Sequence, residues 1–351
     1  MIENGLIWKC LPDSRRLDVF LGDDGCPLVR WSNWTVLPPP VLTDLSKIAD
    51  VYWCEGNREV TSSFADRWIV NISADLDEYR DSLLHLDSVL GTSCPIWNHP
   101  RAVALTRRDL APQVFGGIEG LEVPHVARFA AGHTGVFRQV FAERGFSYPV
   151  LVRPVSSQTG IGLIKINSAD DWVRLEQVTS LGRSYFMTQF VDYRDSRGHF
   201  VKVRICFVDE TISLREYGVS GGWQIGSGGT TSPSSDSAIS ISITQLLQQM
   251  EGFQNWTVLR QICGEMVKRC PLNFWGVDLG VRSDNSFVFF EANAAMTMAV
   301  ASNVPPSHMP MMEPIYQNIA ERLQASFVRI RQGRPMALPL LSIGELLASS
   351  P

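Results

Sequence analysis

The most restrictive feature of the sequence is a stretch near its C-terminal end in which two apolar runs flank a short polar turn. The runs are FWGVDLGV at 274–281 and SFVFFEA at 286–292, and Asp284-Asn285 lies between them. This pattern predicts a β-hairpin. Both runs are apolar almost throughout, which is typical of strands that are buried on both faces, so a carboxylate within them needs a specific partner.

Three oxygen-bearing side chains interrupt this apolar hairpin. Asp278 lies on the first strand, and Glu291 and Asn293 lie on the second, two positions apart and therefore on one face. The turn brings Asp278 nearly opposite Glu291. Two carboxylates and an amide oxygen are ligands that suit Mg²⁺, which would also offset their mutual repulsion. The hairpin therefore predicts a Mg²⁺ site; an amphipathic hairpin with both carboxylates in water is the alternative.

Basic residues and glycines surround a second predicted hairpin at 148–166. The residues expected to contact phosphate are Arg153, Gln158, Gly160, Gly162 and Lys165. A turn rich in small residues leaves backbone N–H groups free to face phosphate oxygens. A plain hairpin loop with solvated charges is the alternative.

The strand expected at 185–192 runs apolar and then turns polar. At such a strand end, main-chain groups of Gln189, Phe190 and Val191 could meet an adenine edge, although a core strand is the simpler interpretation. On the next strand Lys202 and Arg204 share a face, and Arg215 follows on its neighbour. Inward-facing cations need anions such as phosphate or carboxylate; a solvated strand face is the alternative.

The order of these segments resembles that of the ATP-grasp superfamily over roughly residues 95–300. The segments that carry the resemblance are LVRP at 151–154, FVDYRD at 190–195, KVR at 202–204 and FEANAAM at 290–296. They look like a branch often found beside tetratricopeptide repeats. WNHP at 97–100 with TRRD at 106–109 resembles the start of the central domain in that branch. One departure is Arg153, where many relatives have Lys.

The resemblance implies a fold of class α/β and α+β, in which two α+β subdomains hold ATP behind an N-terminal α/β domain. The expected units are 1–100 (N-terminal domain), 101–190 (central subdomain), 191–335 (C-terminal subdomain) and 336–351 (tail). It also implies that Asp278, Glu291 and Asn293 hold Mg²⁺ on the phosphates of ATP and that Asp195 binds ribose. Arg204, with Lys202, would stabilise the transferred phosphoryl group.

The function implied by the resemblance is that of a carboxylate-amine ligase, in which a carboxylate attacks the γ-phosphate of ATP and an amine then displaces phosphate from the acyl-phosphate. A kinase of the same fold, a nucleotide-binding module without turnover, and a scaffold with an accidental resemblance are the alternatives. The loops at 155–162 and 226–242 are expected to close over ATP. Arg215 and Trp223 are candidate substrate contacts, and the identity of the carboxylate and the amine is open.

The composition and the charge disfavour several other classes of protein. A formal net charge of -5 disfavours attraction of the whole surface to nucleic acid or anionic lipid. No apolar run is long enough for a membrane helix, and the N-terminal residues do not form a secretion signal. Seven cysteines without a CxxC pair are typical of buried thiols in a reducing compartment, so we expect a cytoplasmic protein. A homodimer is an open possibility by analogy.

Overall fold

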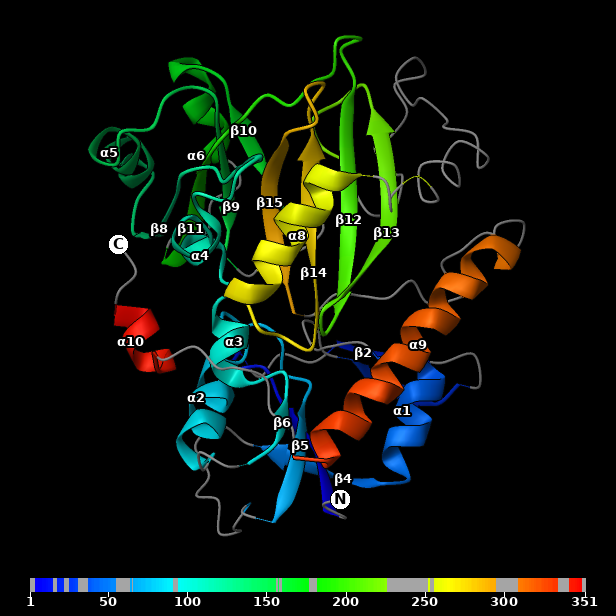
Figure 1. Ribbon diagram of the computed structural model, residues 1–351. Helices are drawn as coiled ribbons and strands as arrows, with labels where there is room; N and C mark the ends of the chain where they lie inside the picture. The colour runs from blue at the N-terminus through cyan, green and yellow to red at the C-terminus, as the bar shows by residue number, and fades with distance from the viewer. Residues whose placement is uncertain are drawn as a thin grey trace.

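The computed structural model of the protein describes residues 4–14, 18–21, 25–30, 37–54, 64, 66–90, 94–155, 157, 160–176, 182–225, 252, 256–294, 309–333 and 341–348. A parallel sheet and two mixed or antiparallel sheets form three units (Figure 1). The predicted class, an α/β unit followed by α+β units, is confirmed by this arrangement. Among the described helices, none combines the length and apolar content needed to cross a bilayer.

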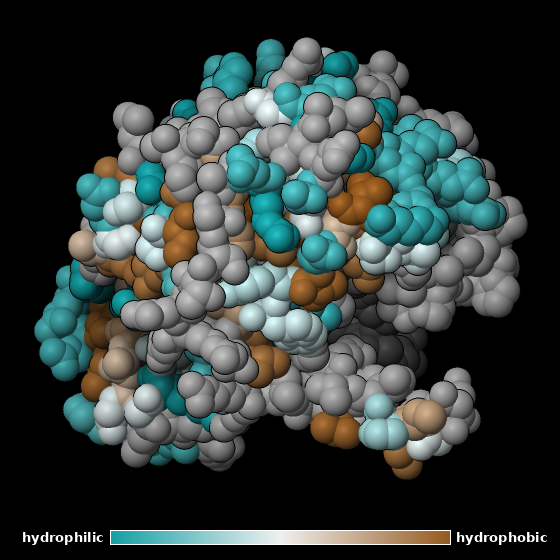
Figure 2. All heavy atoms as spheres, turned by 90° about the horizontal axis from the view of Figure 1, so that it is seen from below, coloured by the Kyte–Doolittle hydropathy of each residue, from teal (hydrophilic) through white to brown (hydrophobic). Residues whose placement is uncertain are grey.

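The N-terminal unit is a parallel sheet in the order β4-β1-β5-β6. Its strands are β1 (Asn4–Cys10), β4 (Ala49–Cys54), β5 (Arg67–Asn71) and β6 (Ile96–Trp97). The helices α1 (Pro39–Ser46) and α2 (Arg80–Val89) accompany it, and β2 (Asp18–Leu21) forms a separate antiparallel pair with β3 (Pro27–Arg30). Seen from this end, apolar and hydrophilic described residues are interspersed on the surface (Figure 2).

The middle unit is an antiparallel sheet in the order β10-β9-β11-β8. Its strands are β8 (Val126–Ala131), β9 (Val150–Pro154), β10 (Ile164–Ile166) and β11 (Arg183–Gln189), and its helices are α5 (Gly135–Glu143), η2 (Ala169–Trp172) and α6 (Val173–Glu176). Its apolar side chains form a core of their own around Phe137, Val152 and Met187.

The C-terminal unit contains the predicted hairpin within a sheet of order β13-β12-β14-β15-β7. Its strands are β12 (Phe200–Val208), β13 (Thr211–Ser220), β14 (Phe274–Val281), β15 (Phe287–Asn293) and the short parallel strand β7 (Leu121–Glu122). Helix α8 (Thr257–Arg269) lies across this sheet in Figure 1 and buries Leu259, Ile262 and Met266. Every residue of β14 is buried, including Asp278, in agreement with the almost entirely apolar run in the sequence.

The segment at 100–115 forms three short elements. They are α3 (Pro100–Ala104), η1 (Arg108–Leu110) and α4 (Ala111–Phe115). Proline favours the first turn of a helix, and both Pro100 and Pro112 lie in such a turn. Arg107 has extended backbone angles (φ -56°, ψ 135°), which separates α3 from η1.

The C-terminal helices return to the first unit. Helix α9 (Met309–Arg331) packs against α1 and β6 as well as β12, and α10 (Ile343–Ala348) packs against α2 and α3. Ser326 on α9 accepts a hydrogen bond from Trp97 Nε1 (3.1 Å) and donates one to Asp209 (3.1 Å). Helix α9 therefore connects the N-terminal sheet to the C-terminal sheet through packing and side-chain hydrogen bonds.

A reciprocal asparagine pair joins the end of β6 to the beginning of β14. Asn98 Oδ1 accepts from the backbone N–H groups of Asn273 and Phe274 (2.9 Å each), and Asn98 Nδ2 donates to the Phe274 carbonyl (3.0 Å). Asn273 Oδ1 in turn accepts from the Asn98 N–H (2.9 Å). Asn98 is 1% exposed and has φ 53°, a left-handed conformation that Asn tolerates better than most residues.

The substitution Asn98→Ala should lower the free energy of unfolding by about 3 kcal/mol, because it removes three buried hydrogen bonds and leaves their backbone partners unsatisfied. Urea denaturation measures this change. Asn285→Ala is the matched control, because Asn285 also has positive φ (61°) but lies exposed in a turn. Equal losses in the two variants would show that backbone conformation, and not the buried pair, matters at position 98.

Candidate functional site

A row of charged residues crosses the C-terminal sheet at one level. The strand register places Arg204 on β12 opposite Asp278 on β14, and Asp278 opposite Glu291 on β15. Asn293 lies two residues beyond Glu291 and opposite Gly276. Directly opposed residues share a face, so the predicted grouping of Asp278, Glu291 and Asn293 on one side of the hairpin is found in the structure.

The carboxylate of Asp278 is buried and ion-paired. Arg204 donates to both of its oxygens, with Nε–Oδ1 at 2.6 Å and Nη2–Oδ2 at 2.8 Å, and Lys202 Nζ lies 3.3 Å from Oδ2. Asp278 and Lys202 are each 5% exposed. A charge buried this deeply is stable only with partners of opposite sign, and the two inward cations predicted on β12 provide them.

Glu291 is held by a residue from outside the sheet. Arg108 on η1 forms an ion pair with Glu291 Oε2 and also donates from Nη1 to the Phe290 carbonyl (3.1 Å). Burial alone would raise the pKa of Glu291, but the charges of Arg108, Arg153 and Arg204 outweigh it and hold the pKa below its ordinary value. Glu291 is therefore ionised at neutral pH.

Two β-bulges lie beside this charged row. The register between β12 and β13 shifts after Arg204, so that Arg215 is skipped in the pairing; the register between β14 and β15 shifts after Asp278, so that Phe290 is skipped. A bulge bends a strand and changes the direction of a side chain or carbonyl. Here the second bulge accompanies the contact of the Phe290 carbonyl with Arg108. Arg215 is 8% exposed and lies near the thiol of Cys206.

The middle sheet supplies a second group of residues. Its register aligns Arg128, Phe186 and Arg153 across β8, β11 and β9, so these three share a face. Arg153 Nε donates to Ser157 Oγ (3.2 Å), and its Nη2 donates to the Ser157 carbonyl, which holds the following loop against the strand. Burial lowers the pKa of Arg153 to about 9, and the charge of Arg108 acts in the same direction.

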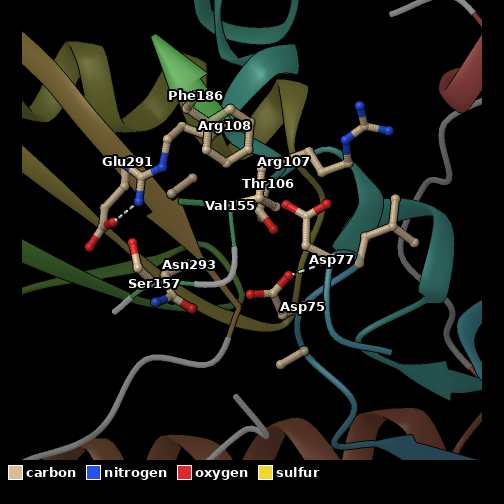
Figure 3. A pocket seen from close by; sticks show the side chains of 13 residues that line it. Asp75, Asp77, Thr106, Arg107, Arg108, Val155, Ser157, Phe186, Glu291 and Asn293 are labelled. Atoms are coloured by element: carbon tan, nitrogen blue, oxygen red, sulfur yellow. Dashed lines mark hydrogen bonds and ion pairs between the residues drawn. The ribbon is translucent and has the colours of Figure 1, made fainter. Parts of the chain in front are cut away.

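A pocket lies where the three units meet (Figure 3). The N-terminal unit contributes Ala74–Asp77, and the middle unit contributes Val155, Ser157 and Phe186. Thr106–Arg108 and the β15 residues Glu291–Asn293 complete the lining. In Figure 3 the side chains of Asp75, Ser157 and Asn293 lie around the same space, whereas Arg107 is directed away. Arg107 instead forms a buried ion pair with Asp109, with Nε–Oδ1 at 2.9 Å.

The N-terminal unit contributes two carboxylates to this pocket. Asp77 forms an ion pair with Arg128, and Asp75 Oδ1 accepts from the Asp77 N–H (2.7 Å). Burial, together with the neighbouring charge of Asp77, raises the pKa of Asp75 to about 7. The pocket therefore has an acidic wall opposite the Arg108–Glu291 pair.

The glycine turn after β9 has the expected backbone conformations. Gly160 and Gly162 have φ values of 78° and 70°, which other residues rarely adopt. A Cβ on Gly160 would lie 2.5 Å from Gln224 Nε2, the end of a flexible side chain that would have to move, so the positive φ is the stronger requirement for glycine here. Gln158 lies outside the described residues, as does the expected closing loop at 226–242.

Lys165 faces aromatic rings. Its Nζ lies 3.3 Å from the centroid of Phe190 and 5.7 Å from that of Trp223. Burial lowers the pKa of Lys165. Phe190 and Trp223 meet edge to face at 6.0 Å and join Tyr193, Phe200 and Phe290 in one apolar cluster beside the C-terminal sheet. Trp223 is thus a packed aromatic, and its carbonyl accepts from Tyr193 Oη (2.8 Å).

The side chain of Gln189 forms its hydrogen bonds within the chain. Its amide donates to the carbonyls of Ser147 (2.9 Å) and Pro149 (3.0 Å) and accepts from the Ser147 N–H (3.1 Å). The backbone N–H groups of Gln189 and Phe190 are also engaged, by His125 and Pro149. Within the described part of the chain, the main chain of Val191 has no hydrogen-bond partner, so Val191 is the position at this strand end that can still offer backbone groups.

The side chain of Asp195 accepts hydrogen bonds from the turn that follows it. Its Oδ1 accepts from the backbone N–H groups of Arg197 (2.9 Å) and His199 (2.8 Å), and its pKa is lowered because these hydrogen bonds favour the charged form over the opposing effect of burial. The neighbouring Arg194 pairs with Asp192. The structure places these residues beside Phe200, at the end of β12, and away from the pocket residues of Figure 3.

Sequence reasoning did not single out several of the pocket residues, among them Asp75, Asp77, Arg108 and Ser157. The segment at 106–109 enters the sequence analysis only through a resemblance. The buried Arg107–Asp109 pair and the partly exposed Arg108 between them are visible only in the structure. Asp75 and Asp77 precede α2, which begins at Arg80.

The donor set fits a hard divalent cation. Within the described ranges, no group of three or more His, Cys, Asp and Glu side chains could hold a metal. The aligned oxygens are two carboxylates, from Asp278 and Glu291, and the amide of Asn293. Mg²⁺ uses few protein ligands and completes its shell with phosphate and water, so this set is sufficient in number and type.

Comparison with known proteins gives only distant likenesses. No protein-family model matches the chain, and no curated protein matches it in sequence. An ATP-grasp RimK domain protein from Sphaerobacter thermophilus is 12% identical, with a TM-score of 0.47 over 92% of this chain and 98% of that one. D-alanine–D-alanine ligase from Bacillus anthracis is 9% identical, with a TM-score of 0.47 over 94% and 98%.

A peptide-modifying enzyme is among the other similar structures. The macrocyclase MdnC from Microcystis aeruginosa, bound with precursor peptide MdnA, is 13% identical, with a TM-score of 0.45 over 91% of this chain and 99% of that one. Each of these structures has a TM-score below 0.5, so the function of this chain is argued from its own residues.

The stability of the protein should depend on the ionisation of Asp75. The pKa of Asp75 is raised to about 7 in the folded protein, against about 3.9 in an unfolded chain, so ionisation lowers the free energy of unfolding as pH rises between these values. In Asp75→Asn this loss disappears. The variant should therefore gain stability relative to the wild type from pH 4.5 to 7.5, measured by urea denaturation.

Asp77→Asn is the control for this measurement. It removes the ion pair with Arg128 and should lower stability. Its gain at higher pH should be smaller than that of Asp75→Asn, because it removes only the part of the raised Asp75 pKa that the charge of Asp77 causes. A pH-independent difference between Asp75→Asn and the wild type would contradict the environment described for Asp75.

Proposed function

We propose that the protein is an ATP-dependent carboxylate-amine ligase of the ATP-grasp type. The observation that carries the proposal is the aligned row of Arg204, Asp278 and Glu291, with Asn293 beside it. Glu291 and Asn293 also line a pocket shared by three units. Paired carboxylates that are already ionised, with buried cations beside them, suit a metal-bound triphosphate better than an apolar ligand.

ATP would lie between the middle and C-terminal sheets. Asp278, Glu291 and Asn293 would hold Mg²⁺, and Arg153, with the Gly160–Gly162 turn, would face the phosphates. The base would enter the aromatic cluster near Phe190, where Val191 can offer main-chain groups and Lys165 lies over the ring. Gln189 and Asp195 are assigned no ligand contact, because their side chains are used within the chain.

The donor carboxylate would attack the γ-phosphorus from the pocket side and form the acyl-phosphate, while the bond from phosphorus to the bridging oxygen breaks and ADP leaves with its electrons. When bound, Mg²⁺ would screen the charge of the phosphate oxygens. Arg204 and Lys202 lie next to the carboxylates that would hold it, so they can neutralise the charge that spreads over the transferred phosphoryl group. The amine then attacks the acyl carbon, the C–N bond forms, and phosphate leaves with the electrons of the broken C–O bond.

Because the N-terminal unit forms one wall of the pocket, an acceptor amine that is small or extended could approach along that wall. Asp75 and Asp77 form the wall nearest that unit, so a cationic amine would find favourable charge there. Residues from three units line the pocket, which would exclude water from an acyl-phosphate once substrate fills it. The substrate carboxylate and amine are proposed only at this level of chemical class.

ADP release from ATP and Mg²⁺ should appear only with a suitable carboxylate, in a screen that pairs amino acids and small carboxylic acids. With hydroxylamine as nucleophile the product should be a hydroxamate, because an acyl-phosphate is trapped. A kinase acting on a hydroxyl group would release ADP without hydroxamate, and a binding module would release none.

Arg204→Met is expected to lower the rate of hydroxamate formation by about 10²–10³-fold, since it removes a preorganised cation from the developing charge. Arg322→Met is a suitable control, because Arg322 lies on α9 and hydrogen-bonds to Asn318 and Thr211, away from the row. If both variants kept full activity, the charged row would not be the catalytic centre.

A further inference from the structure

Arg108 is held in place by the residues on either side of it. Arg107 and Asp109 form a buried ion pair, with side chains 4% and 3% exposed, and this pair fixes the short helix η1. Arg108 lies between them and is directed the other way, toward β15, as Figure 3 shows. Its position is therefore set by the fold and not by a flexible surface loop.

The guanidinium of Arg108 has two different partners on β15. Nη1 donates to the Phe290 carbonyl (3.1 Å), and Nη2 forms the ion pair with Glu291 Oε2. Phe290 is the bulged residue that the β14–β15 register skips, so its carbonyl is available to a side chain. One nitrogen of Arg108 can keep this carbonyl while the other changes its partner.

The two carboxylates of the row differ in how they are neutralised. Asp278 has Arg204 and Lys202 from the neighbouring strand of its own sheet. Glu291 has a direct ion pair with Arg108, which arrives from a different unit. Arg108 holds Oε2 of Glu291. A metal ion that binds both oxygens of this carboxylate would need the oxygen that Arg108 now holds, and it would bring positive charge close to a guanidinium. Both cannot occupy that oxygen.

We propose that Arg108 takes the place of the metal on Glu291 in the nucleotide-free protein and is displaced when Mg²⁺ binds with the nucleotide. The displaced guanidinium keeps its bond to the Phe290 carbonyl and turns into the pocket, where it binds an anionic oxygen of the donor substrate. This inference rests on the proposed function, because it requires nucleotide and metal at the charged row.

The remaining charges of the pocket support this assignment. Arg107 is paired with Asp109, and Arg128, beside the pocket, is paired with Asp77. Among the described residues that line the pocket, Arg108 is thus the arginine whose partner a metal ion would take away. Metal binding and donor binding are then coupled through one side chain: the site acquires a cation for the donor carboxylate only after the metal has arrived.

The test uses the full chain and a titration of Mg²⁺ in the presence of a saturating non-hydrolysable ATP analogue, followed by calorimetry. Arg108→Gln should lower the half-saturating Mg²⁺ concentration by about fivefold, the effect expected when a partly buried ion pair no longer competes. Arg128→Gln is the matched control, since it removes the same charge beside the same pocket without freeing Glu291, and should leave this value within about twofold of the wild type.

Measurements in a Glu291→Gln variant separate competition between Arg108 and Mg²⁺ from a general effect of charge on Mg²⁺ binding. In Glu291→Gln the carboxylate is gone, so adding Arg108→Gln should no longer tighten Mg²⁺ binding. Arg108→Lys retains the charge but has no second nitrogen to hold the Phe290 carbonyl, so it should give an intermediate value and serves if Arg108→Gln does not fold, as judged by circular dichroism.

Two results would overturn the inference, and they differ. If Arg108→Gln and Arg128→Gln change Mg²⁺ binding equally, or if Arg108→Gln weakens it, Arg108 does not compete with metal, while the nucleotide site stands. If the wild-type protein binds neither nucleotide nor Mg²⁺ under these conditions, the proposed function fails and this inference fails with it.

Discussion

The buried ion pair between Asp278 and Arg204 is the interaction on which the rest of the site depends. A carboxylate that is 5% exposed inside a sheet of Phe, Trp and Val would be strongly destabilising without a partner. Antiparallel pairing of β12 with β14 places the two residues directly opposite, and the bidentate geometry satisfies both oxygens. The same level of the sheet then continues to Glu291 and, through it, to Arg108 outside the sheet.

The part of this arrangement that could be predicted from the sequence is the part that strand periodicity controls. A side chain in a strand can point to only two faces, so the positions of Glu291 and Asn293 two apart, and of Lys202 and Arg204 two apart, determine which residues lie together. The polar turn at 284–285 sets the pairing of Val281 with Phe287, whereas the bulge at Phe290 brings Glu291 opposite Asp278. Burial of every β14 residue agrees with its nearly continuous apolar run, which only Asp278 interrupts.

The part that could not be predicted comes from contacts between distant segments. Arg108 and Glu291 are 183 positions apart, and nothing in either segment encodes their meeting. The side chain of Gln189 has the same chemical groups whether it meets a ligand or a neighbouring loop, and only the fold shows that it holds 147–149. The bulge at Phe290 likewise leaves no sequence signal, because Phe fits the strand equally well in or out of register.

The separate core of the middle sheet has a mechanical consequence. The N-terminal and C-terminal sheets share α9 and the Asn98–Asn273 pair, so displacing one against the other would expose packed apolar side chains and break buried hydrogen bonds. The middle sheet encloses its own apolar residues, and at the pocket it meets the first unit through the partly buried pair of Arg128 and Asp77. A rigid-body rotation of this sheet would therefore disturb little of its internal packing, whereas the other two sheets would have to move together.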